Sequence, residues 1–231
     1  MRDRDITVVK LGGSLAGSEH LIRWLDALAT CGGRVILVPG GGAFSDAVRA
    51  AQATMGFDDA AAHAMALLAM EQFGLALANL RPGFTVAASA AAIRRVLRDG
   101  NVPVWAPAAM VLRASDISPS WDITSDSLAA WLAGRFGVRR LVLVKHGAAP
   151  DGPVSAADLA ARGVVDPAFP RFLAASGAQA FIVAPEAHAA AGAAIRTGGT
   201  VGTRIDLQQQ DATGLHSSPW PRLRRRAGAG P

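Results

Sequence analysis

The hydrophobic positions along this chain form two kinds of segment. The first is a short, continuous apolar run rich in Val, Ile and Leu, which is typical of a strand buried on both faces. Such runs predict strands at residues 6–11, 34–38, 139–145 and 179–184, with shorter strands at 84–87, 102–105 and 200–206. In the second kind, apolar residues recur three and four positions apart, which predicts helices. These helices are expected near 21–28 and at 43–53, 58–80, 125–136 and 186–196.

Strands that alternate with helices predict an α/β fold with a mostly parallel sheet covered on both faces. Ligands of such sheets bind beyond the carboxyl ends of the strands. We expect one domain over residues 1–207. The segment 208–231 is rich in Gln, Ser, Pro, Arg and Gly, which predicts a disordered tail.

Composition indicates a globular protein, because 51% of the residues are hydrophobic and 18% are charged. The single cysteine, Cys31, excludes an intramolecular disulfide and fits a reducing cytoplasm. We expect no signal peptide, no stretch of 18 or more residues apolar enough to span a bilayer, and therefore a cytoplasmic protein without a membrane partner. The long apolar helix at 58–80 has more apolar surface than one sheet face needs, which predicts a homo-oligomer.

Basic residues are concentrated at the C-terminal end. The tail carries four arginines and one acid, and it therefore supplies three of the five net positive charges. The rest of the chain shows no basic pattern interleaved with aromatic residues, so we expect no nucleic-acid partner.

Lysine is rare in this chain. Only Lys10 and Lys145 are lysines among 23 basic residues, and each lies at the end of an apolar run, shortly before a glycine. Lysine presents a compact point charge that the planar guanidinium group of arginine does not reproduce. Both lysines are therefore candidates for contact with phosphate.

The segment from Lys10 to Ser14 has the residues of a phosphate-binding turn. Gly12 and Gly13 let the backbone approach a ligand, and backbone N–H groups and the Ser14 hydroxyl can donate to phosphate oxygens. The spacing is neither that of a Walker loop nor that of the dinucleotide-binding fingerprint. A plain tight turn is the alternative interpretation of this segment.

A second glycine loop follows the apolar run at 34–38. Three successive glycines make a flexible element, whereas a plain turn needs only one or two. A ligand lying against bare backbone is the favoured interpretation, and a simple loop is the alternative. The glycines are Gly40, Gly41 and Gly42.

Polar residues cluster at the start of the helix predicted at 125–136. Thr124 or Ser125 can cap this helix, and Asp126 in its first turn interacts favourably with the helix dipole. Asp126 can also pair with a lysine and orient its ammonium group for catalysis. Lys145, followed by Gly147, can reach the phosphates or the nucleoside of a nucleotide. The five histidines show no metal-ligand spacing, so we expect no protein metal site.

In this order and spacing, the four segments resemble the amino acid kinase superfamily over residues 5–207. The resemblance implies a three-layer αβα fold that binds ATP over its C-terminal half and a small-molecule phosphoryl acceptor over its N-terminal half. It implies that Lys10 stabilises the transferring phosphoryl group, that Asp126 organises the cations and that Lys145 contacts nucleotide. Gly12, Gly13, Ser14 and Gly147 would bind the nucleotide, and Mg²⁺ would accompany it. No lysine follows Lys145, unlike in acetylglutamate kinases, so an arginine or Mg²⁺ would supply that charge.

Two further segments, at 63–74 and 121–127, resemble the enzymes that phosphorylate (5-(aminomethyl)furan-3-yl)methyl phosphate to its diphosphate in C1-carrier cofactor synthesis. This resemblance implies an acceptor with a phosphate, an aromatic ring and an amine. Asp122 or Glu71 could bind the amine, Trp121 could pack on the ring and Arg49 could bind the phosphate. The alternative interpretations are that Arg49 is a surface charge, Glu71 a solvated helix residue and Trp121 part of the core packing.

Other activities remain open at this point. Isopentenyl phosphate kinases place a histidine after the second glycine loop, where this chain has residues 43–46 without one. Uridylate kinases differ in the first loop, and aspartate kinases carry a regulatory domain. A uridylate, isopentenyl phosphate or amino-acid kinase remains an alternative, as does a non-catalytic anion- or nucleotide-binding protein of the same fold.

Overall fold

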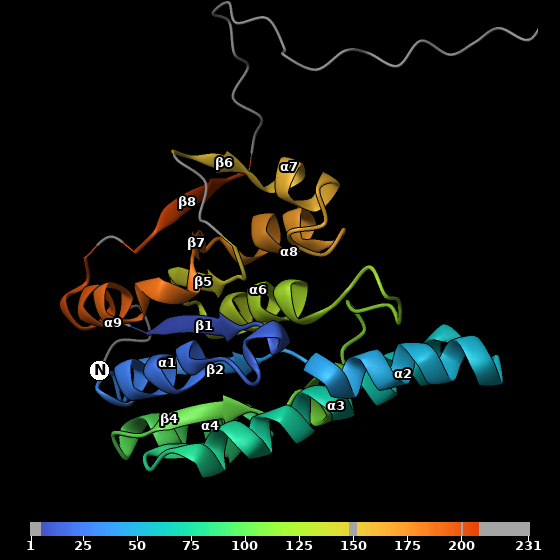
Figure 1. Cartoon of the computed structure of the whole chain (residues 1–231), viewed down its shortest axis with the longest axis horizontal. Coiled ribbons are helices and arrows are strands. Elements are labelled where there is room, and N and C mark those ends of the chain that lie inside the picture. The colour runs from blue at the N-terminus through green and yellow to red at the C-terminus, as the bar shows by residue number, and fades with distance from the viewer. Residues whose placement is uncertain (1–5, 148–151, 200, 208–231) are drawn as a thin grey trace, which may run out of the picture.

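The described residues of this computed structural model, 6–147, 152–199 and 201–207, form one eight-stranded sheet between two layers of helices (Figure 1). The predicted tail at 208–231 lies outside the described residues. In chain order the strands are β1 (Thr7–Leu11), β2 (Val35–Pro39), β3 (Phe84–Ala87), β4 (Val102–Trp105), β5 (Arg140–Val144), β6 (Val154–Ser155), β7 (Gln179–Val183) and β8 (Thr203–Asp206).

The sheet has the order β3-β4-β2-β1-β5-β7-β8-β6, and its neighbouring strands are parallel except for the antiparallel pair β7 and β8. β1 lies at the centre, between β2 and β5. The two strands that precede the glycine loops, β1 and β2, are therefore adjacent. Because they are parallel, their loops leave the same edge of the sheet.

The helices cover both faces of the sheet. One core packs residues of β1, β2, β5 and β7 against α4 (Ala90–Arg98), α6 (Ser125–Phe136) and α8 (Phe169–Ser176), joined by the short helices α5 (Ala108–Val111) and α7 (Ala156–Ala161). The opposite core packs the alternate strand residues against α1 (Glu19–Ala29), α9 (His188–Thr197) and part of α3 (Asp59–Leu80). This alternation follows from the two-residue period of a strand and explains why apolar residues occupy successive positions in these runs.

The α/β class, the mostly parallel sheet and the three-layer sandwich are confirmed. The helix predicted at 186–196 is divided into a 3₁₀ turn, η3 (Pro185–Ala187), and α9. The hydrophobic pattern does not predict α4, α5, α7, α8 or β6. Each of these elements is nine residues or shorter, and so short a segment contains little periodicity.

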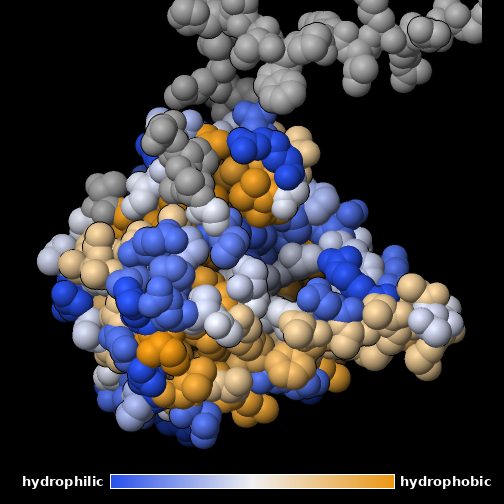
Figure 2. Space-filling view, in the orientation of Figure 1, coloured by the Kyte–Doolittle hydropathy of each residue, from blue (hydrophilic) through white to orange (hydrophobic). Residues whose placement is uncertain are grey.

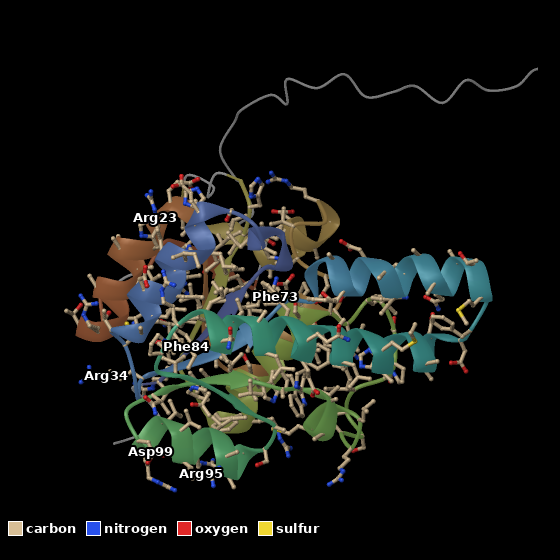
Figure 3. All side chains as sticks on the ribbon, turned by 60° about the horizontal axis from the view of Figure 1, so that its bottom comes forward. Arg23, Arg34, Phe73, Phe84, Arg95 and Asp99 are labelled. Carbon is tan, nitrogen blue, oxygen red and sulfur yellow. The ribbon has the colours of Figure 1, made fainter. Side chains whose placement is uncertain are left out.

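The long helix α3 packs against α2 (Gly42–Met55), and the two form an arm that projects from the sheet (Figure 1). Phe73 of α3 and Phe84 of β3 are buried in the same core, whereas the labelled charged residues lie at the periphery (Figure 3). By length and composition, α3 could cross a membrane, so the expectation that no such stretch exists is wrong. Its hydropathy comes mainly from alanine and leucine, and 44% of the apolar window is buried inside the protein.

Large apolar side chains are exposed along this arm, which Figure 2 draws mostly in the pale orange of mildly hydrophobic residues. The exposed side chains on α2 and α3 are Phe44, Met55, Met65, Leu68, Leu75 and Leu80. Such a surface is consistent with contact between copies of the chain. The homo-oligomer stays a prediction.

The two glycine loops touch. The backbone N–H of Gly40 donates to the carbonyl of Leu11 at 2.8 Å. A Cβ atom placed on Gly13 would lie 2.2 Å from the Cα and N atoms of Gly42. The first loop continues as a 3₁₀ turn, η2 (Gly13–Leu15), and Gly42 begins α2. Glycine at position 13 is therefore a packing requirement, independent of any ligand.

We expect Gly13→Ala to separate the two loops and to lower the free energy of unfolding by about 1–3 kcal/mol, the scale of overpacking a tight contact. Gly12→Ala is the matched control, because a Cβ there would meet its nearest atoms at 3.4 Å. Urea unfolding of both variants measures the difference. Equal stability of the two would contradict the close contact between the loops.

Candidate active site

Two lysines and one aspartate meet at the carboxyl edge of the sheet. Residues two apart on a strand share a face, so Lys10 on β1 points to the same side as Val8, which packs in the core under α6. Lys145 directly follows β5 and shares that side with Leu143. Asp126 lies in the first turn of α6, the helix that covers this face.

Asp126 pairs with both lysines at once. Its Oδ1 lies 3.0 Å from Nζ of Lys10, and its Oδ2 accepts a hydrogen bond from Nζ of Lys145 at 2.5 Å. The side chains of Lys10 and Asp126 are 6% and 5% exposed, and that of Lys145 is 17% exposed. The two ammonium groups are therefore fixed by one carboxylate, and the second of them remains partly open to the solvent. We call these three residues the Lys-Asp-Lys cluster.

Burial and charge act together on the pKa values of this cluster. Burial lowers the pKa of Lys10 and Lys145 adds to the effect, while Asp126 opposes it; the pKa of Lys10 lies below its ordinary value. Burial alone would raise the pKa of Asp126, but the two ammonium groups outweigh it and hold that pKa below its ordinary value. Asp126 is therefore a carboxylate at neutral pH.

The first turn of α6 is held by Asp166, which precedes α8. Its carboxylate accepts hydrogen bonds from the backbone N–H groups of Thr124 and Ser127 at 2.9 and 3.0 Å, and from both of their hydroxyl groups. Burial and the nearby Asp126 raise the pKa of Asp166, and these hydrogen bonds oppose the rise. The predicted cap by Thr124 or Ser125 is absent, since neither side chain caps the helix. The position of Asp126 therefore depends on a residue about 40 positions away.

A cavity of about 350 Å³ opens beside both glycine loops. Its walls come from η2, the start of α2, the start of α6 and one side of α3, so it lies where the arm joins the body (Figure 1). The residues predicted to bind ligands that line it are Gly13, Ser14, Gly40, Gly41, Gly42, Arg49 and Trp121. The cavity thus has backbone N–H groups at one end and charged and aromatic side chains at the other.

Arg49 and Trp121 form one wall of the cavity together. The guanidinium carbon of Arg49 lies 3.7 Å from the centroid of the Trp121 ring, and the indole N–H donates to Oε1 of Gln52 at 2.7 Å. Gln52 in turn donates to Asp59 at the start of α3. These contacts hold the exposed Arg49 side chain over the cavity.

Comparison with known proteins agrees with this geometry. A model of the amino acid kinase family matches residues 5–147, more than half of the chain. This chain belongs to the amino acid kinase family. The match covers both glycine loops, Asp126 and Lys145, so the predicted family is confirmed.

Relatives within the amino acid kinase family differ in their acceptors. The (5-(aminomethyl)furan-3-yl)methyl phosphate kinase of Methanocaldococcus jannaschii is 26% identical over 139 residues, which cover 59% of this chain and 63% of that relative. A uridylate kinase from Archaeoglobus fulgidus superposes with a TM-score of 0.66 at 18% identity, over 87% of this chain and all of that structure. An isopentenyl phosphate kinase superposes with a TM-score of 0.59 at 16% identity, over 87% of this chain and all of that structure. The two structures show the fold shared by the family.

Besides the two lysines of the cluster, four predicted ligand-binding residues do not line the cavity. Glu71 accepts a hydrogen bond at 2.8 Å from the backbone N–H of Ala108, so its carboxylate holds the start of α5. Asp122 is exposed and does not line the cavity. Gly12 is buried beside the Lys-Asp-Lys cluster, and Gly147 follows Lys145 with a positive φ of 99°. The amine-binding role expected of Glu71 or Asp122 therefore has no support from their positions.

The cavity contains polar residues that the sequence analysis missed. Ser45 and Asp46 lie on the first turns of α2, and His63 lies on α3. Asp46 precedes Arg49 by three positions, which places both on one side of a helix. His63 precedes Leu67 and Met70 at the same kind of spacing, and all three line the cavity. Helical periodicity from Arg49 could have identified Asp46, but only the packing of α2 on α3 brings His63 to it.

We expect Asp126→Asn to leave one buried and one partly buried ammonium group without a counter-charge and to lower the free energy of unfolding by about 3–5 kcal/mol. The carboxylate raises the pKa of Lys10, so its removal lowers that pKa further. The alkaline limb of the kcat/KM profile should then move to lower pH, because kcat/KM reports the free enzyme.

The matched control for this substitution is Asp99→Asn, which changes an exposed carboxylate at the periphery (Figure 3). Chemical unfolding and a pH–rate profile measure both effects. If Asp126→Asn had the free energy of unfolding and the pH–rate profile of Asp99→Asn, Asp126 would not interact electrostatically with the two lysines.

Proposed function

We propose that this protein is an ATP-dependent kinase that transfers the γ-phosphoryl group to (5-(aminomethyl)furan-3-yl)methyl phosphate and forms its diphosphate. The observation that carries the proposal is the Lys-Asp-Lys cluster beside a cavity that both glycine loops border. Phosphoryl transfer depends on positioning and on neutralising charge, and it needs little covalent chemistry from the protein.

The Lys-Asp-Lys cluster suits the transfer of a phosphoryl group between two anions. Lys10 lies at the centre of the sheet, next to the loop that borders the cavity, where its ammonium group can neutralise the charge that develops on the transferring group. Lys145 is more open and lies at the end of β5, where it can bind nucleotide phosphates. Asp126 holds both ammonium groups in place before substrate binds, which reduces reorganisation during the reaction.

The donor set fits the phosphates of ATP, with two lysines, the loop N–H groups and the Ser14 hydroxyl. Mg²⁺ supplies further neutralisation of phosphate charge when it is bound. Among the described residues no group of three acidic, histidine or cysteine side chains could hold a metal. We infer that Mg²⁺ enters with the nucleotide, because this ion is commonly bound through substrate phosphates and its own water.

The chemistry of the cavity favours an acceptor with charge of both signs. Arg49 and the glycine loops can bind a phosphomonoester, and the Trp121 side chain offers apolar surface to a ring. Asp46 is the cavity carboxylate that can bind an ammonium group, in place of Glu71 or Asp122. An isopentenyl chain has no group that would pair with Asp46. The relative from Methanocaldococcus jannaschii, whose acceptor carries the expected phosphate, ring and amine, is a further support.

An acceptor panel with Mg-ATP tests the proposal. It compares aminomethylfuranyl methyl phosphate, uridine monophosphate, isopentenyl phosphate and acetylglutamate. We expect kcat/KM for the furan to exceed the others by about 10²-fold or more, because the other acceptors leave buried or charged cavity groups unpaired. A higher kcat/KM for another acceptor would show that the furan is not the acceptor of this enzyme. ATP binding without transfer to any acceptor would favour a non-catalytic nucleotide-binding protein.

We expect Lys10→Ala to lower kcat by about 10²-fold or more, the scale seen when one preorganised donor to the transition state is removed. Lys10→Arg keeps the charge but replaces a compact ammonium group with a planar fork in a buried position, and we expect little recovery of turnover. Steady-state kinetics of the two purified variants, with circular dichroism as a folding control, measure this. A folded Lys10→Ala variant with nearly normal turnover would remove Lys10 from the mechanism.

A further inference from the structure

His63 is a buried polar residue in the wall of the cavity that the mechanism does not use. Its side chain comes from α3, the residue is 6% exposed, and it borders the cavity together with Leu67 and Met70. Its Nε2 atom is buried, and no atom of the described residues hydrogen-bonds with it. A buried polar nitrogen without a hydrogen-bond partner costs free energy, and a ligand that hydrogen-bonds with it removes this cost.

The surroundings of His63 determine which hydrogen-bonding group it presents. Burial lowers its pKa, and a hydrogen bond with the backbone of Ser120 raises the pKa by a smaller amount. A carbonyl that accepts from a ring N–H has this raising effect. Because Nε2 has no partner, Nδ1 is the ring nitrogen left to interact with the Ser120 carbonyl. A neutral imidazole with its proton on Nδ1 presents a lone pair on Nε2.

A lone pair on Nε2 discriminates between the parts of an acceptor molecule. Phosphate oxygens only accept hydrogen bonds when they are ionised, so they do not pair with it. An ammonium group has three N–H donors and pairs with it well. In the same cavity Arg49 and the glycine loops already provide donors for phosphate, whereas Asp46 provides the counter-charge for an amine.

We propose that His63 is a specificity-determining residue, whose Nε2 accepts a hydrogen bond from the amine of the phosphoryl acceptor. This inference rests on the proposed function, since it requires an acceptor that enters this cavity and carries an N–H donor. It adds a neutral, directional contact to the charge of Asp46. The contact gives the site a way to reject acceptors of similar shape that lack the amine, because such acceptors leave Nε2 unpaired.

The test compares two acceptors, aminomethylfuranyl methyl phosphate and an analogue with a methyl group in place of the aminomethyl group. Kinetic constants are measured for the wild type, His63→Phe and His63→Gln. Phenylalanine keeps the ring shape without Nε2, and glutamine restores a side-chain acceptor. Gln72→Ala is the control, because Gln72 is exposed on the same helix and does not line the cavity.

We expect His63→Phe to raise KM for the amine acceptor by about 10- to 100-fold, the scale of a hydrogen bond to a charged group. KM for the methyl analogue should change little, KM for ATP should not change, and His63→Gln should recover part of the preference for the amine. A purely structural role would raise both KM values together. Equal changes for both acceptors would therefore overturn the assignment.

A measurement without substitution keeps the inference testable if His63→Phe does not fold. The ¹⁵N resonances of histidine-labelled wild-type protein report which ring nitrogen carries the proton. The Nε2 resonance of His63 should have the shift of an unprotonated nitrogen and should move when the amine acceptor is added, but not when the methyl analogue is added. An imidazolium in the complex would instead indicate a contact with phosphate and would contradict the proposal.

The outcomes separate the two proposals. If the wild type phosphorylates neither furan, the proposed function is wrong and the role of His63 is wrong with it. If the wild type phosphorylates the furan and prefers the amine, but the preference survives in both His63 variants, only the role of His63 is wrong.

Discussion

One buried carboxylate holds two lysines at the centre of the sheet, and the rest of the site depends on this contact. A single ammonium group in this position would be costly to bury, and two would repel each other. Asp126 pairs with both, at 3.0 Å and 2.5 Å, and its own pKa falls in response. Without Asp126 the two ammonium groups would lie close together without a counter-charge, so this carboxylate fixes the geometry of both cations.

The carboxylate needs support from outside its own helix. Asp166 accepts four hydrogen bonds from Thr124 and Ser127 at the start of α6, and it thereby holds the turn that carries Asp126. The glycines of the two loops let β1 and β2 end in direct contact. The glycines allow a backbone contact that a side chain would prevent, whereas Asp166 uses its own side chain to hold the helix start.

The cavity that we propose for the acceptor is built differently. It lies where the α2–α3 arm joins the sheet, so its walls combine the glycine loops with side chains from two helices. This wall carries the charges of Asp46 and Arg49, the Trp121 ring and the imidazole of His63. It therefore differs chemically from the Lys-Asp-Lys cluster. The acceptors named for its relatives differ from one another.

The sequence by itself determined the parallel sheet, both glycine loops and the three residues of the cluster. Continuous apolar runs identify buried strands, and two lysines among 23 basic residues are conspicuous. The sequence also predicted an ion pair between Asp126 and a lysine. Only the tertiary structure decided the capping by Asp166, the use of Glu71 to hold α5, and the entry of Asp46 and His63 into the cavity. These contacts join residues from separate elements, and their geometry is set by how helices pack on the sheet, which local periodicity does not encode.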